Sequence, residues 1–382
     1  MLKNSFKILC IQPSLPYDDT SPENKFTCLA KEKGISSDVI VLNPFNTRDL
    51  EMVKVIANLP YNTKVSYHLN TTRGEKIGFW KQSKFVIQKA IALSKKNQYD
   101  AILVYGTQLT GLYGILLKVL LKGTKLITMV QTNPIACVND QPFLKRKLKL
   151  LLTRWVLNCS DHLHLLYKNQ LIGFKNCKTP FSVFHDYVSI GDLEPSEKDE
   201  DKYILFLGFP FFKKGVDILI KAFNQVSDEF PDVTLKIVGH CEDFYHPWMV
   251  MANRNPRIKF YKAVFHQEAL ELINKCSLFV LPSRLEGLPR VIIEAMLLSK
   301  LVIASNVDGI PSIIIDNQTG LLFENENSGQ LAEKLRMALS AKDGLETISK
   351  NGYRFAKEHL SPEVYAEESY KMLEKVCRNE NE

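Results

Sequence analysis

Short runs of β-branched and apolar residues alternate with longer stretches of helical periodicity along almost the whole chain. Runs such as Lys125–Val130 are nearly continuous in apolar side chains, as strands buried on both faces are. Strands separated by helices are typical of βαβ units in a parallel sheet. In the first half, we expect strands over residues 7–12, 38–43, 100–105, 125–130 and 162–166, with helices over residues 80–97, 109–121 and 143–157.

The pattern restarts after residues 194–201 (EPSEKDED), where a proline and dense charge indicate a linker. Beyond it, we expect strands over residues 203–208, 234–238, 258–261, 278–281, 302–305 and 320–323, with helices over residues 215–229 and from Gln267, Arg290 and Gln330. A chain of 382 residues is long enough for two domains of roughly 150–200 residues.

The predicted fold is therefore α/β, with two Rossmann-like, doubly wound domains facing across a cleft. The domains span residues 1–195 and 196–360, and the segment 361–382 forms a final helix. For this helix, a return to the N-terminal domain is an alternative to packing on the second.

Composition narrows the class of protein. Apolar residues are 45% and charged residues 24%, an ordinary globular profile that argues against a disordered or fibrous chain. The eight cysteines are scattered without a C-x-x-C pair, as reduced cytosolic thiols are. The N-terminal apolar run is too short for a signal peptide, and no stretch approaches the roughly 20 apolar residues of a spanning helix. We therefore expect a cytoplasmic protein.

Charge is unevenly divided between the halves. Residues 1–195 carry 26 Lys and Arg against 14 Asp and Glu, a net charge of +12, and residues 196–382 carry −5. The excess suggests an anionic partner for the first half, although free drift of surface charge explains it equally well.

One stretch of the basic half is both amphipathic and cationic. From Phe143 to Leu157 (FLKRKLKLLLTRWVL), Leu144, Leu148, Leu151, Leu152 and Trp155 share a helical face, with basic residues around the rest. A basic amphipathic helix with a tryptophan can lie in a membrane interface. A helix packing its apolar face on the sheet is the alternative. Contact of residues 143–157 with an anionic membrane surface, at the inner face of the membrane, is thus one of two open interpretations.

The segment from Leu281 to Ser305 (LPSRLEGLPRVIIEAMLLSKLVIAS) carries the most chemistry. A strand leads into a loop with Glu286 and Gly287, and a helix follows Pro289. Free N–H groups at a helix N-terminus suit a diphosphate. Carboxylates such as Glu286 and Glu294 accept vicinal hydroxyls of a sugar or ribose. Taken singly, each glutamate is better explained as a solvated surface acid, but the two together, with the turn at Gly287 and Pro289 and a strand on either side, favour a ligand site.

This segment resembles the retaining group 1 (family 4) glycosyltransferases. Glu286 and Glu294 match the Glu-x7-Glu motif of that family, and the surrounding residues are similar to its PSxxEGxPxxxxEAM pattern. Lys214-Gly215-Val216-Asp217 resembles the KGxD motif, and Gly309-Ile310-Pro311 resembles GxPE. The resemblance covers residues 202–323, and in the first 195 residues it is architectural only.

The resemblance implies a role for each matching residue. Glu286, at the donor sugar, and Lys214, at the diphosphate, would be the catalytic residues. Glu294 would hold the donor ribose. The other donor-binding positions are Lys213, Gly208, Phe265 and the loop residues Gly287, Leu288 and Pro289. The family needs no metal or cofactor, and none is expected here beyond the nucleotide diphosphate sugar itself.

Several positions depart from the family pattern. Phe209 stands where the family has an arginine after the strand glycine, and Lys213 is not a bidentate substitute for it. Gln131 or Thr132 replaces the histidine after a strand of the first half, and no Gly-Gly loop follows the first strand, only residues 13–20. The family's Gly, Pro and Glu further on are Ser299, Leu301 and Ser312.

Other signals are weak. Asp199-Glu200-Asp201 has the form of a metal-binding Asp-x-Asp but lies in the charged linker, and His240, His246 and His266 lack metal-ligand spacing. No G-x-G-x-x-G follows the first strand of either half, which argues against NAD. Nothing indicates a nucleic-acid partner.

The predicted function is a retaining, metal-independent glycosyltransferase of the hexosyltransferase type, acting in surface polysaccharide, lipopolysaccharide or other glycan synthesis. Its partners would be a nucleotide-sugar donor and a glycan or lipid-linked acceptor. A sugar-nucleotide epimerase on the same scaffold, and a non-catalytic subunit that binds glycans or nucleotide sugars, are the alternatives.

Overall fold

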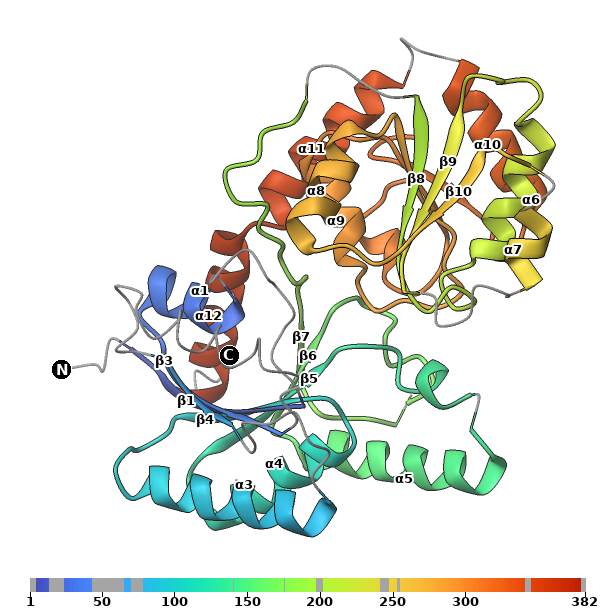
Figure 1. The fold of residues 1–382 in the computed structure, drawn as a ribbon. Helices are drawn as coiled ribbons and strands as arrows, with labels where there is room; N and C mark the ends of the chain where they lie inside the picture. The colour runs from blue at the N-terminus through green and yellow to red at the C-terminus, as the bar shows by residue number, and fades with distance from the viewer. Residues whose placement is uncertain are drawn as a thin grey trace. The chain divides into compact units, whose positions relative to one another are not determined.

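The chain divides into two units, each built around one parallel sheet (Figure 1). The first comprises Met1–His185 with Pro362–Glu382, and the second comprises Asp186–Ser361. The structure is a computed structural model that describes residues 5–13, 24–42, 65–69, 78–139, 141–174, 176–196, 202–240, 247–252, 255–340 and 345–378.

The sheet of the first unit has seven strands in the order β3-β2-β1-β4-β5-β6-β7, all paired in parallel. Continuous burial of the central strands explains their uninterrupted apolar runs. The strand order reverses between β1 and β4, which makes this a doubly wound sheet. The strands are β1 (Lys7–Gln12), β2 (Ser36–Val41), β3 (Val65–Leu69), β4 (Ala101–Tyr105), β5 (Lys125–Val130), β6 (His162–Leu165) and β7 (Phe181–Val183).

Helices cover both faces of this sheet. On one face lie α3 (Phe79–Ser94), α4 (Leu109–Leu120) and α5 (Phe143–Cys159), and on the other lie α1 (Lys25–Lys33) and α12 (Pro362–Cys377) (Figure 1). A 3-10 turn, Ala136–Val138, precedes α5. The α12 helix is held against the first unit by an ion pair between Lys33 and Glu367 and by an edge contact of Tyr370 with Phe6.

The second unit repeats the architecture with six strands in the order β10-β9-β8-β11-β12-β13. Its strands are β8 (Tyr203–Leu207), β9 (Thr234–Val238), β10 (Ile258–Tyr261), β11 (Leu278–Leu281), β12 (Val302–Ser305) and β13 (Leu321–Phe323). Its helices are α6 (Val216–Val226), α7 (Pro247–Ala252), α8 (His266–Lys275), α9 (Arg290–Leu297), α10 (Ser328–Ser340) and α11 (Glu346–His359), with a 3-10 turn at Ile310–Ser312.

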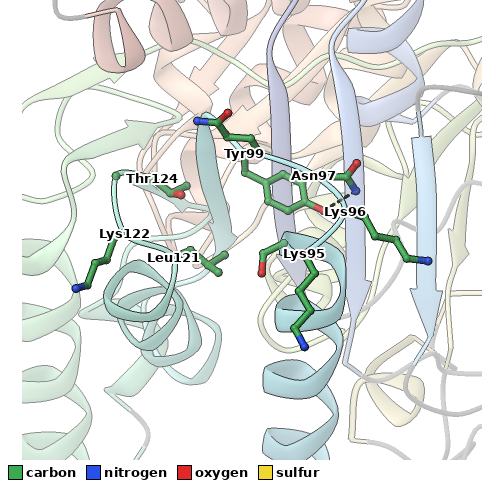
Figure 2. A pocket seen from close by; sticks show the side chains of 10 residues that line it. Lys95, Lys96, Asn97, Tyr99, Leu121, Lys122 and Thr124 are labelled. Atoms are coloured by element: carbon green, nitrogen blue, oxygen red, sulfur yellow. Dashed lines mark hydrogen bonds between the residues drawn. The ribbon is translucent and has the colours of Figure 1, made fainter.

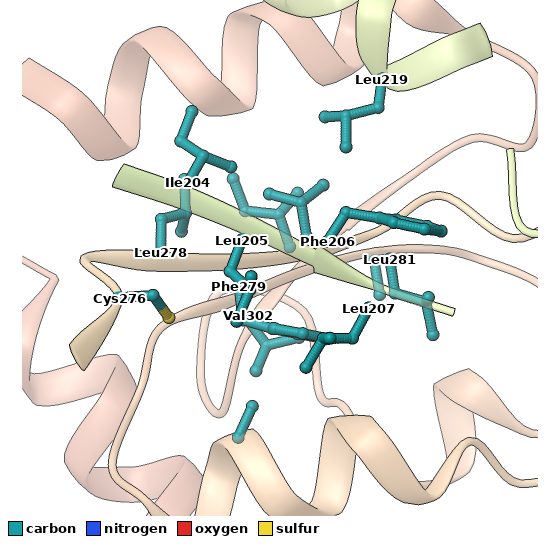
Figure 3. Packing of buried hydrophobic residues seen from close by; sticks show 14 of the residues in the cluster. Ile204, Leu205, Phe206, Leu207, Leu219, Cys276, Leu278, Phe279, Leu281 and Val302 are labelled. Atoms are coloured by element: carbon teal, nitrogen blue, oxygen red, sulfur yellow. The ribbon is translucent and has the colours of Figure 1, made fainter. Parts of the chain in front are cut away.

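One apolar core fills the second unit between its sheet and helices (Figure 3). Phe206 from β8 and Phe279 from β11 are fully buried on the central strands. Because Phe279 pairs with Leu205, the two rings lie on opposite faces of the sheet, and Leu219 of α6 lies on the face of Phe206 (Figure 3). These central strands are therefore fixed relative to each other, and so are the loops that leave them.

The prediction of two Rossmann-like domains is confirmed, with differences of detail. The first unit ends at His185, whereas the sequence placed the boundary after residue 195, because Val188 is buried in the core of the second unit and Ile190 and Leu193 pack against it. The sequence missed β3 and β7. The α12 helix belongs to the first unit. Most of the expected linker, residues 197–201 with Asp199-Glu200-Asp201, lies outside the described residues, as do His246 and most of the loop after β1.

The apolar stripe of α5 does not pack on the sheet, so that alternative is wrong. The helix instead buries Thr153, Val156 and Leu157 and leaves Leu148 and Trp155 more than half exposed. Among the described residues, no helix has the length and apolar content to span a bilayer.

A polar hollow of about 530 Å³ lies at the amino-terminal edge of the first sheet (Figure 2). It is formed by the turns that precede β4 and β5, and Tyr99 in its wall donates a 2.7 Å hydrogen bond to the buried Asp38. Ligands of doubly wound sheets bind at the opposite, carboxyl-terminal edge. This hollow is therefore distinct from the predicted site.

A buried histidine makes the stability of the first unit depend on pH. His162 on β6 is 2% exposed, and burial, helped by the nearby Lys375 ammonium, lowers its pKa to about 4. Between that pKa and the ordinary value near 6.5, the unfolded chain binds more protons than the folded one, so stability falls as pH falls through this window.

We expect the free energy of unfolding to drop by about 2 kcal/mol from this residue between pH 7 and pH 5. Urea denaturation of wild type and His162→Asn at both pH values measures the effect. The substitution should reduce the pH dependence, and an equal slope in both proteins would show that His162 does not cause it.

Candidate functional site

The predicted site residues of the second unit gather at the carboxyl-terminal edge of its sheet. Lys213 and Lys214 lie in the loop after β8, and Glu286 lies in the loop after β11. The two strands are neighbours, with Ile204 paired to Leu278. Because parallel strands end at the same edge, these two loops meet there.

Gly215 allows the two loops to touch. Its φ of 72° lies in the left-handed region, and a Cβ at this position would lie 1.9 Å from the carbonyl oxygen of Pro282. The backbone N–H of Arg284 donates to the carbonyl of Lys213 at 2.8 Å, which ties the loops together. Only glycine permits both the backbone conformation and the close approach.

The two predicted catalytic residues are in direct contact. Lys214 Nζ lies 2.6 Å from Glu286 Oε1, and the hydroxyl of Ser283 donates to the same oxygen at 2.6 Å. The Glu286 side chain is 7% exposed and that of Lys214 is 22% exposed. The backbone N–H of Glu286 donates to Asp308 at 3.1 Å, which fixes the loop beneath the carboxylate. Two side chains thus hold one oxygen of the carboxylate, and Asp308 holds the backbone of its loop.

Arg284 and Asp217 form a second ion pair that the sequence alone did not identify as part of the site. The guanidinium binds both oxygens of Asp217, at 2.8 and 2.9 Å, and also donates to the Phe212 carbonyl. Burial opposes ionisation of Asp217, but the hydrogen bonds from Arg284 outweigh it and hold the pKa of this carboxyl below its ordinary value. The pair joins the β11 loop to the first turn of α6, just after Lys214.

The loop after Glu286 leads into the N-terminus of α9. Gly287 and Leu288 are half-buried, and Pro289 is the N-cap residue, directly before Arg290, where the predicted helix also begins. No side chain caps this end of the helix. The first backbone N–H groups of a helix lack carbonyl partners within it, so this end can bind an anion.

Glu294, one helical turn into α9, contacts a residue that the sequence analysis set aside. His266 Nε2 lies 3.0 Å from Glu294 Oε1, with side-chain exposures of 17% and 8%. His266 is the first residue of α8, and the exposed Phe265 precedes it as the N-cap. Spacing had excluded His266 only as a metal ligand; its proximity to Glu294 follows from the packing of α8 beside α9.

The family arginine position is occupied by an aromatic side chain. Phe209 is half exposed and makes an edge contact with His240, with ring centroids 5.4 Å apart. Next to it, Gly208 gives space to Lys214, whose Cγ would lie 3.3 Å from a Cβ at that position. Lys213 is exposed. Nothing in this loop supplies a guanidinium at the position of Phe209.

Another departure from the family pattern lies in the first unit. Gln131 and Thr132 follow β5 in the first unit, where the Thr132 hydroxyl contacts Cys137 Sγ. In the part of the chain that the structure describes, no group of three His, Cys, Asp or Glu side chains is placed to hold a metal ion.

The close approach at Gly215 predicts a large loss of stability on substitution. Gly191 provides a matched control, because its φ of 62° is also left-handed, but a Cβ there would meet nothing within 4 Å beyond its own chain neighbours. We expect Gly191→Ala to cost about 1–2 kcal/mol for the backbone conformation alone. Gly215→Ala adds the collision with Pro282 and should cost roughly 1–3 kcal/mol more.

Chemical denaturation followed by circular dichroism measures both variants. Equal losses of stability for Gly191→Ala and Gly215→Ala would contradict the close approach of the two loops.

The second unit is similar to known glycosyltransferases. Residues 192–355 match the family described as glycosyl transferases group 1. An uncharacterised glycosyltransferase of Methanocaldococcus jannaschii is 34% identical over 159 residues, which are 40% of this chain and 42% of that protein. The capsular polysaccharide biosynthesis glycosyltransferase CapM of Staphylococcus aureus is 26% identical over 172 residues, 44% of this chain and 45% of CapM.

The chain thus spans less than half the length of these curated relatives. A solved structure is similar over nearly the whole length of both chains, that of the Anabaena protein HepE in complex with UDP-glucose. The similarity has a TM-score of 0.74 at 18% sequence identity, and it covers 97% of this chain and 100% of that one. At this identity the similarity concerns the fold.

Proposed function

We propose that the protein transfers a glycosyl group from a nucleotide diphosphate sugar to an acceptor hydroxyl, with retention of the anomeric configuration. The match of residues 192–355 to the group 1 glycosyltransferases supports this proposal. The observation that carries this proposal is the contact between Lys214 and Glu286 at the carboxyl-terminal edge of the sheet, beside the N-terminus of α9.

The diphosphate would lie between Lys214 and the first turn of α9. Both supply positive charge, one as an ammonium and the other as backbone N–H groups aligned with the helix dipole. As the bond to the sugar breaks, negative charge develops on the leaving diphosphate. A cation positioned there stabilises that charge, which lowers the barrier to transfer. Lys214 would exchange its contact with Glu286 for the phosphate.

Glu286 would then accept hydrogen bonds from hydroxyls of the donor sugar. Its carboxylate is nine-tenths buried and is oriented by Ser283, so little reorientation is needed when the sugar arrives. Glu294 would accept the ribose hydroxyls. His266 occupies one of its oxygens, which leaves the other for the ligand.

The acceptor would be a growing surface polysaccharide or a lipid-linked glycan. In support, CapM takes part in capsular polysaccharide synthesis, and the HepE structure contains UDP-glucose. We further propose that the protein works in the cytoplasm, at the inner face of a membrane, and that it needs neither metal nor cofactor.

A panel of nucleotide sugars tests the function as a whole. Donors that raise the melting temperature are incubated with glycan and lipid-linked acceptors, and the products are examined by NMR for the anomeric configuration. Transfer or slow hydrolysis with retention supports the proposal. Interconversion of sugar epimers would indicate an epimerase, and binding without turnover would indicate a non-catalytic subunit, the alternative suggested by Phe209.

Lys214→Ala should weaken diphosphate binding, because it removes a charge-assisted contact worth on the order of 1.5–3 kcal/mol. Lys221→Ala, an exposed lysine further along α6, is the matched control. Titration calorimetry with nucleoside diphosphates should give a dissociation constant raised about 10-fold or more for Lys214→Ala alone. Unchanged affinity would remove Lys214 from the site.

Substitutions of Glu286 and Glu294 should affect different kinetic constants. Glu294→Ala should raise the KM for the donor, since ribose contacts are made equally in the ground and transition states. Glu286→Ala should mainly lower kcat, because the reacting sugar changes most in the transition state. The exposed Glu271 of α8 offers a control as Glu271→Ala. Wild-type kcat/KM in either active-site variant would overturn its assigned role.

A further inference from the structure

Exposed apolar side chains concentrate on one layer of the first unit. Among the described residues, half of the large apolar side chains that are exposed belong to α3, α4 and α5, the three helices on the same face of the sheet (Figure 1). The most exposed are Trp80 at 82%, Phe143 at 80%, Leu144 at 78%, and Val119 and Leu148 at 68% each. Such a concentration on one face marks an interaction surface.

The exposed residues of α5 form a continuous stripe. Leu144, Leu148, Leu151 and Trp155 follow one another at spacings of four, three and four residues, which places them on one side of the helix. The opposite side, with Val156 and Leu157, packs on the unit. The helix therefore has two apolar sides, of which one packs on the rest of the first unit and the other is exposed.

The same layer carries positive charge without compensation from its own helices. Together, α3, α4 and α5 have Lys or Arg at nine positions and neither Asp nor Glu at any. On α5, Lys145, Lys147 and Arg154 flank the stripe, and Arg146 and Lys149 lie further round the helix. Lys118 on α4 pairs with Asp161, which lies between α5 and β6.

The combination of apolar stripe and cations selects among partners. A second copy of this chain would bring one cationic layer against another, which is repulsive. A nucleic acid would match the cations but leave the leucines exposed to water. An anionic bilayer satisfies both, because its phosphates face the cations and its acyl boundary receives the apolar side chains.

We infer that α3, α4 and α5 form a docking face by which the first unit lies on an anionic lipid surface, with the α5 stripe and Trp80 inserted into the headgroup region. A helix between two parallel strands runs antiparallel to them, so Trp80 and Phe143, at the starts of α3 and α5, lie toward the carboxyl-terminal edge of the sheet. That is the ligand-binding edge in doubly wound folds. A membrane held by this face would present a lipid-linked acceptor near that edge, and only this last step rests on the proposed function.

Tryptophan fluorescence offers a direct test. Two of the three tryptophans, Trp80 and Trp155, lie on the docking face, and the third, Trp248, belongs to the second unit. In a Trp248→Phe protein, vesicles of phosphatidylcholine and phosphatidylglycerol should shift the emission to shorter wavelength, and brominated lipids should quench it. Pure phosphatidylcholine should do neither. Binding to anionic vesicles without quenching would show that another surface makes the contact, which would overturn the inference.

Two matched variants that each remove three charges test the electrostatic contribution to lipid binding. Changing Lys145, Lys147 and Arg154 to Gln removes three cations from the docking face, and changing Lys350, Arg354 and Lys357 to Gln removes the same residue types from exposed positions of α11. At about 1 kcal/mol for each basic residue near an anionic surface, the first change should weaken vesicle partitioning on the order of 100-fold, and the second should leave it near wild type. Binding of wild type should fall as salt rises.

Leu144→Ser with Leu148→Ser tests the apolar part, and circular dichroism verifies that these exposed changes leave the fold intact. Their partitioning should also fall at least 10-fold. If instead wild type self-associates in sedimentation experiments and these changes abolish it, the face is a contact between copies, and the lipid inference is wrong.

Vesicle binding is measured without donor or acceptor, so Lys214→Ala should bind vesicles like wild type. Failure of transfer with intact vesicle binding would count against the proposed function alone.

Discussion

Adjacent parallel strands end at the same edge of a sheet, and the candidate site depends on this constraint. Because β8 and β11 are neighbours, the loop with Lys214 and the loop with Glu286 leave the sheet side by side. Gly215 then permits a closer approach than any side chain would, and Arg284 joins the second loop to Asp217 at the start of α6. The chemistry proposed for the site needs no further feature to bring its charged groups together.

Much of this fold could be predicted because buried parallel strands have a strong sequence signal. The two strands missed in the first unit, β3 and β7, lie at the edges of the sheet. The three residues of β7 alternate between exposed and half-buried, so they lack the continuous apolar run that marks a central strand. The position of the boundary between the units could not be predicted from the sequence either, because Val188 packs in the core of the second unit but lies in an irregular segment with no periodic pattern.

The candidate site was likewise only partly predictable from the sequence. Its main residues were predicted from a motif, whereas their partners Asp308 and His266 were not, because contacts between segments far apart in sequence leave no fixed spacing. Ser283 lies three residues before Glu286, and its contact with the carboxylate was not predicted either. Periodicity likewise showed that α5 is amphipathic but could not show which side faces the sheet. Thr153, Val156 and Leu157 form the buried side, although the leucine stripe is the more apolar of the two.

The place of α12 has a consequence for the order in which the protein is made. The chain leaves the first unit after His185 and returns to it only at Pro362. During synthesis, every residue of the second unit leaves the ribosome before the helix that pairs Glu367 with Lys33 and packs Tyr370 on Phe6. Domains generally fold from the N-terminus onward. Here the second unit is complete in sequence first, and the nascent first unit keeps one face of its sheet without α12 until the final segment arrives.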